Sequence, residues 1–119
     1  MIHGCLTRVH DDRVIQNISK TSNFLERMRG LLGSPPLNEN EGLLIVPCSS
    51  VHTFGMSYAI DLVFLDEQWI IVKTVSALKP WRISASNAAS MVVELAVDSL
   101  DKLQLTTGQQ LEWHDDSAD

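Results

Sequence analysis

The sequence predicts a single α+β domain over residues 1–119, mainly β, with about seven or eight short strands in a small curled sheet or barrel and one or two helices. Three observations support this prediction. Short runs rich in Val, Ile and Leu recur between turn-forming residues. One segment carries apolar residues at helical spacing. The length of 119 residues, with 45% hydrophobic and 20% charged residues, suits one globular domain.

The N-terminal part is expected to form a hairpin followed by a helix. β-Prone runs flank an Asp pair within residues 5–15, which is typical of a hairpin. Residues 19–23 then offer side-chain oxygens for a helix N-cap. The apolar spacing from Phe24 to Leu32 predicts a helix with one buried face, which ends at Gly33.

The rest of the chain is expected to be mostly strands. A short helix capped by Asp98 and Ser99 should interrupt them and run to Leu103. The expected strands are residues 42–46, 51–54, 59–65, 69–75, 91–97 and 110–113.

Charge and hydropathy narrow the classes of function. The net charge of −6 and the scattering of the nine basic residues argue against a broad nucleic-acid-binding face. No run approaches the roughly 20 apolar residues of a membrane helix. The N-terminus shows no secretory pattern, and Cys5 and Cys48 are far apart, so we expect a cytoplasmic protein with reduced cysteines.

The stretch from Cys48 to Asp66 holds the densest set of reactive side chains. Asp61 lies in an apolar strand, where an unpaired carboxylate is costly to bury. It either bonds to backbone amides, to Arg29 or to Arg82, or serves as a ligand-binding or acid/base residue. Strand alternation places it on the face of Val63, opposite Leu62.

His52 precedes Asp61 by nine residues and Cys48 precedes His52 by four. A His–Asp pair would fix the imidazole tautomer, and a Cys–His pair could form an activated thiolate. One hypothesis is therefore a hydrolase or transferase in which His52 acts with Asp61 or Cys48. The alternative is a partly buried histidine and a small apolar cysteine with structural roles.

A metal site is a further hypothesis. Thiolate, imidazole and thioether from Cys48, His52 and Met56 form the ligand set of blue-copper sites, with His3 or His10 as a second imidazole. Met56 also suits a role as core filler. No cofactor is predicted, and the chain lacks the paired spacing of a zinc site.

The pair Trp81-Arg82 could hold a carboxylate, a phosphate or a sugar face. Our main hypothesis is a binding or accessory domain for a small polar or anionic ligand or a partner protein. His52 and Arg82 would meet the ligand, Asp61 would orient them, Trp81 would form an apolar wall, and Arg29 would be a further candidate. A purely structural interaction domain is the remaining alternative.

The order of several short blocks resembles a known family. From about Thr21 to Trp113 the chain is similar to the bacterial and archaeal family called domain of unknown function one-nine-two, in a branch with Pro-Cys and His-Thr-Phe-Gly-Met. This resemblance implies a small, mostly β fold and brings no established activity. The matching blocks are Arg29–Gly33, Gly42–Ile45, Val51–Met56, Ile60–Asp66, Pro80–Arg82, Val93–Leu95, and Gly108 with Leu111.

Overall fold

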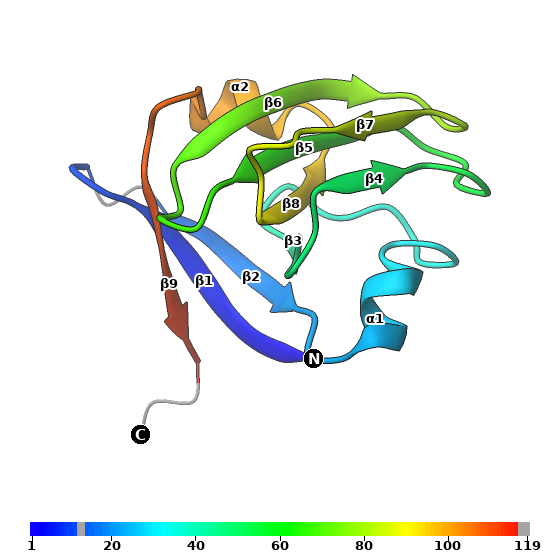
Figure 1. Cartoon of the computed structure of the whole chain (residues 1–119), viewed down its shortest axis with the longest axis horizontal. Helices are drawn as coiled ribbons and strands as arrows, with labels where there is room; N and C mark the ends of the chain where they lie inside the picture. The colour runs from blue at the N-terminus through cyan, green and yellow to red at the C-terminus, as the bar shows by residue number, and fades with distance from the viewer. Residues whose placement is uncertain (12–13, 117–119) are drawn as a thin grey trace.

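The computed structural model describes residues 1–11 and 14–116, which form a mainly β domain with nine strands and two short helices (Figure 1). Within these residues no helix is long and apolar enough to cross a membrane. The elements are β1 (Ile2–Arg8), β2 (Val14–Lys20), α1 (Phe24–Arg29), β3 (Gly42–Ile45), β4 (Ser50–His52), β5 (Ile60–Leu65), β6 (Ile71–Leu78), β7 (Ile83–Ala85), β8 (Met91–Ala96), α2 (Ser99–Leu103) and β9 (Leu111–Asp115).

Seven strands form one curled sheet in the order β6-β5-β8-β3-β2-β1-β9. Its two edges meet at one end, where the N–H of Ile71 donates to the carbonyl of Gln109 (2.8 Å) and the N–H of Leu111 donates to that of Trp69 (2.9 Å). The predicted fold class is therefore confirmed. The predicted hairpin is β1–β2, although its residues 12–13 lie outside the described part of the chain.

Strands β4 and β7 form a separate antiparallel pair that lies over the outer face of the curled sheet (Figure 1). Strand β7 was not among the predicted strands. Its side chains reverse the usual pattern, because Ser84 is buried while Ile83 and Ala85 are exposed. Hydrophobic alternation therefore gives no signal for this strand.

The curled sheet is packed with apolar side chains on both faces. Within the curl lie alternate residues of the central strands, including Val63 of β5 and Val93 of β8. The outer face carries the intervening residues, such as Phe64 and Val92, which pack beneath the β4–β7 pair. The period-two alternation of a strand thus assigns each side chain to one of two cores.

Asp61 lies inside the curl and is fully buried, with 0% of its surface exposed. One carboxylate oxygen accepts the N–H of Ala77 (2.8 Å) and the other accepts the N–H of Leu100 (3.0 Å). Leu100 is the second residue of α2, so Asp61 caps this helix from the sheet. Asp98 and Ser99 were expected to cap it. Asp98 has a left-handed backbone (φ 74°) and makes no side-chain capping bond, and the Oγ atom of Ser99 has no hydrogen-bond partner in the described part of the chain.

Helix α1 is shorter and less buried than the apolar spacing predicted. It ends at Gly30, whose φ of 51° is unfavourable for a residue with a side chain. Its apolar residues Phe24 and Leu25 are 63% and 76% exposed, and no residue of the helix is buried. The prediction of a buried helix face was therefore wrong.

Polar contacts at its first turn hold α1 in place. Asn23 caps the helix by accepting the N–H of Glu26 (2.9 Å), as the predicted N-cap segment suggested. Glu26 in turn accepts the backbone N–H of Ser22 (2.8 Å) and pairs with the N-terminal ammonium (3.0 Å). The bonds from Ser22 and from this ammonium lower the pKa of Glu26 to about 2.

Replacement of Asp61 tests its role as the cap of α2. In Asp61→Asn, the side-chain NH₂ group replaces one of the two accepting oxygens, so one backbone N–H loses its acceptor. This change should lower the free energy of unfolding by about 2–3 kcal/mol. Asp98→Asn should cost under about 0.5 kcal/mol, because Asn tolerates the left-handed backbone. Urea unfolding would measure both values, and hydrogen exchange at Ala77 and Leu100 should accelerate only in the first variant. Equal costs for the two variants would contradict this role.

Candidate functional site

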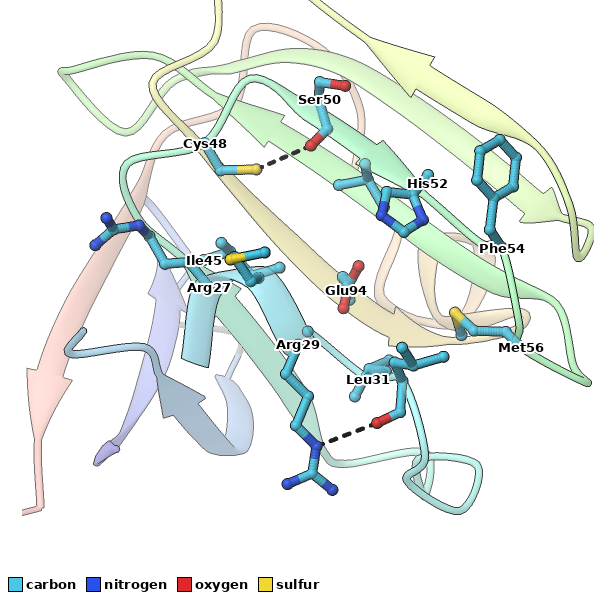
Figure 2. A pocket seen from close by; sticks show the side chains of 14 residues that line it. Arg27, Arg29, Leu31, Ile45, Cys48, Ser50, His52, Phe54, Met56 and Glu94 are labelled. Atoms are coloured by element: carbon cyan, nitrogen blue, oxygen red, sulfur yellow. Dashed lines mark hydrogen bonds between the residues drawn. The ribbon is translucent and has the colours of Figure 1, made fainter. Parts of the chain in front are cut away.

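A pocket opens on the outer face of the curled sheet, between the C-terminal end of α1 and β4 (Figure 2). The volume within it that a bound group could occupy is about 60 Å³, and the pocket opens to solvent. One wall is the segment from Arg27 to Leu32, and the other comes from residues 48–56. Ile45 of β3 and Glu94 of β8 lie between these walls. The pocket therefore suits a small group rather than a large cofactor.

Glu94 is the buried charged residue of this pocket. Only 3% of its surface is exposed, and its Oε1 atom has no hydrogen-bond partner within residues 1–11 and 14–116. Figure 2 shows its carboxyl group in the middle of the lining side chains. Gly30 lies close by, since a Cβ built there would be 3.6 Å from Oε1. A buried polar atom without a partner is uncommon in folded proteins and calls for an explanation.

Burial raises the pKa of Glu94 to about 7, well above the ordinary value of 4.5. Each pKa unit corresponds to about 1.4 kcal/mol, so burial disfavours the charged form by about 3 kcal/mol. Near neutral pH the carboxyl group is therefore balanced between two forms. Its neutral form can donate a hydrogen bond, and its ionised form can only accept them.

His52 lies at the mouth of the pocket as the last residue of β4. Its ring packs against Phe54, with 5.0 Å between the ring centroids. Phe54 in turn stacks on Trp81 at 5.8 Å. These three side chains form an exposed aromatic row, of which His52 and Phe54 line the pocket.

Cys48 also lines the pocket, but its thiol donates to the backbone carbonyl of Ser50 (3.2 Å). Burial raises the pKa of this thiol, which disfavours the reactive thiolate. Met56 is buried in the outer core. Among the residues that the structure describes, no three His, Cys, Asp or Glu side chains gather as a metal site.

The structure separates the residues of the predicted polar site. His52 and Arg29 line the pocket, together with Cys48 and Met56. Asp61 faces the interior of the curl, on the opposite side of the sheet from Glu94.

Trp81 and Arg82 lie in the connection between β6 and β7, outside the pocket lining. Thr53 holds this connection, because its Oγ1 atom accepts the N–H of Arg82 (2.9 Å) and donates to the carbonyl of Lys79 (2.6 Å). The side chain of Arg82 donates to the carbonyl of Trp81 (3.3 Å). Arg82 precedes Ile83, the residue that pairs with His52 between β4 and β7, whereas Asp61 faces the interior of the curl, so the three residues do not form one site.

Glu94 was not among the site residues predicted from the sequence. The signal was present, because Glu94 is a lone carboxylate within the apolar strand Met91–Ala96. The same criterion selected Asp61. Applied evenly, it would have identified both buried carboxylates of the sheet.

These features define a small, mainly β domain with a pocket on the outer face of a curled sheet. The chain belongs to the DUF192 family, described as Uncharacterized ACR, whose model matches residues 7–113. The resemblance seen in the sequence is therefore confirmed.

Two archaeal relatives are UPF0127 proteins. The protein of Thermococcus sibiricus is 32% identical over 97 residues, which cover 76% of this chain and 61% of that protein. The protein of Pyrococcus abyssi is also 32% identical over 97 residues, with coverage of 76% and 80%. The chain thus spans less than two thirds of the Thermococcus protein.

Two crystal structures share the fold. A proposed transcription regulator from Sinorhizobium meliloti superposes with a TM-score of 0.82 at 16% identity, over 93% of each chain. A protein of unknown function from Novosphingobium aromaticivorans has a TM-score of 0.74 at 18% identity, over 93% of this chain and 84% of that one. At these identities the likeness establishes the fold alone.

The raised pKa of Glu94 predicts a pH-dependent stability. The folded state holds its proton up to about pH 7, whereas the unfolded chain releases it near 4.5, so stability falls as the pH rises between these values. Glu94→Gln removes this loss of stability. The substitution should therefore raise the free energy of unfolding more at pH 8 than at pH 4, with a difference of up to about 3 kcal/mol.

Urea unfolding at both pH values would measure this difference. Glu67→Gln, in an exposed turn, is the control and should act equally at pH 4 and pH 8. An effect of Glu94→Gln that is the same at both pH values would contradict the assignment.

Proposed function

We propose that the protein is a binding domain that holds a small group in the pocket above Glu94. The observation that carries this proposal is the buried carboxyl group of Glu94, which lines a pocket open to solvent and whose Oε1 atom has no hydrogen-bond partner among the described residues. Pockets with apolar walls and few convergent polar groups are typical ligand sites.

A comparison with the other buried polar groups supports a binding role. Asp61 uses both carboxylate oxygens as acceptors, and the hydroxyl of Thr53 both donates and accepts. These groups stabilise the fold. In the part of the chain that the structure describes, two buried side-chain atoms have no hydrogen-bond partner, Oε1 of Glu94 and Oγ of Ser99, and of these two residues Glu94 lines the pocket. The burial of this carboxyl group lowers stability. Such local costs are expected where a residue serves function.

The remaining lining residues define roles in binding. Leu31, Ile45 and Met56 supply apolar walls. His52 stands at the mouth and can contact a polar part of the ligand. The aromatic row continues beyond the pocket to Trp81. Where the bound group is part of a larger partner, this exposed row offers that partner a contact surface.

The cytoplasm is the proposed location. The two cysteines, Cys5 and Cys48, are both free, which suits a reducing compartment.

A bulky residue at the pocket mouth should block binding. Ser50 is exposed and lines the pocket, so Ser50→Trp should abolish the amide shifts that a small-fragment library causes at residues 27–32, 48–56 and 94. Ser49 is exposed but is not part of the lining, and Ser49→Trp should leave the shifts unchanged. Two-dimensional NMR titrations would show both. Binding that survives Ser50→Trp would place the site elsewhere.

Single alanine variants separate the pocket from the site around Arg82. His52→Ala removes a lining side chain and should weaken fragment binding by about fivefold, which corresponds to about 1 kcal/mol. Arg82→Ala should change the affinity less than about twofold, because Arg82 is outside the lining. The same titrations measure both affinities. A loss with Arg82→Ala that exceeds the loss with His52→Ala would favour the site predicted from sequence.

A further inference from the structure

We infer that the group bound in this pocket is an ammonium or guanidinium cation carried on a short apolar stem. This inference rests on the proposed binding function and adds the chemical class of the ligand. It depends on the charge, the walls and the mouth of the pocket.

The lining contains two positive side chains, and neither pairs with Glu94. Arg29 donates through Nε to the carbonyl of Leu32 (3.1 Å), and the guanidinium of Arg27 lies over the ring of Phe24 (5.8 Å). Figure 2 shows both guanidinium groups directed away from the carboxyl group. No ion pair to Glu94 is found in residues 1–11 and 14–116. The carboxylate thus faces the pocket as an acceptor that the protein's own cations do not use.

The walls suit an aliphatic stem. Leu31, Ile45, Val51 and Met56 are buried apolar residues of the lining. A methylene chain against these side chains would be removed from water, which favours binding by about 0.8 kcal/mol for each buried CH₂ group. A head group at the end of that stem would then reach the carboxyl group of Glu94.

The mouth also favours a positive ligand. His52 and Phe54 line it, and Phe54 stacks on Trp81. The faces of Phe and Trp rings attract ammonium and guanidinium groups within about 6 Å. A cation that enters therefore passes the aromatic side chains of His52 and Phe54 before it reaches the carboxylate.

Binding of a cation should couple to the protonation of Glu94. The other titratable groups around it are Arg27 and Arg29 on the α1 side, Cys48 and His52 on the β4 side, and Tyr58. The charge of Glu94 contributes to the raised pKa of the Cys48 and Tyr58 groups, which stay neutral. A cation binds the ionised carboxylate, so its affinity should rise as the pH rises through about 7.

The test uses four probes of similar size: n-butylammonium, n-butylguanidinium, butyrate and 1-butanol. NMR titrations at pH 6 and pH 8 would give the dissociation constants for the wild type and for Glu94→Gln. The two cations should bind the wild type about tenfold more tightly at pH 8, where the carboxylate is ionised. Glu94→Gln should weaken them at least about tenfold at pH 8 and remove the pH dependence.

His52 also faces the mouth, so the pH series is repeated in His52→Ala. The dependence should persist there if Glu94 causes it, and its loss in His52→Ala would overturn the coupling to Glu94. Ser50→Trp provides a second variant that closes the mouth without altering Glu94, and it should abolish binding of both cations.

The outcomes separate this inference from the proposed function. Butyrate or butanol that binds as tightly as the cations, with shifts in the lining, would overturn the cation class and leave the pocket as a binding site. The absence of shifts with all four probes would overturn both proposals. Capped lysine and arginine dipeptides identify the source of the cation. If these dipeptides bind more tightly than n-butylammonium, the cation is a side chain of a polypeptide. If they bind more weakly, it is a free amine.

Discussion

Burial of strands β3, β5 and β8 on both faces is the constraint on which the rest of the structure depends. Their residues alternate between the core inside the curl and the core beneath the β4–β7 pair. Any polar side chain in these strands is removed from water, whichever face it occupies. Without a hydrogen-bond partner, it lowers the free energy of unfolding. Two carboxylic acids, Asp61 and Glu94, are under this constraint, one on each face.

The two carboxyl groups meet the constraint in opposite ways. Asp61 accepts two backbone N–H groups and joins the start of α2 and the end of β6 to the sheet. Glu94 lies under a pocket, its Oε1 atom has no hydrogen-bond partner in the residues that the structure describes, and burial raises its pKa to about 7. The first arrangement stabilises the fold. The second keeps a hydrogen-bonding group available to whatever enters the pocket, at the expense of stability.

Much of the fold follows from patterns in the sequence, whereas the candidate site depends on tertiary contacts. Turn residues and short runs of apolar and β-branched residues predicted β1–β2, β5 and β8. The same logic failed for α1, since its end is set by the backbone of Gly30 and its apolar residues stay exposed. His52 and Asp61 were grouped by their separation of nine residues, but spacing along the chain does not tell that β4 lies outside the curled sheet while Asp61 faces its interior. Glu94 was recognisable as a lone carboxylate in an apolar strand, while the pocket above it required the structure.

The measurement that tests this account most directly is the pKa of Glu94, followed through its side-chain carboxyl ¹³C signal by NMR between pH 4 and pH 9. The account predicts titration near 7, and a lower midpoint when n-butylammonium is present, because a bound cation stabilises the ionised form. A midpoint near the ordinary value of 4.5 would contradict it. That result would mean that the carboxyl group is solvated or paired in the folded protein, and the pocket would lose its central feature.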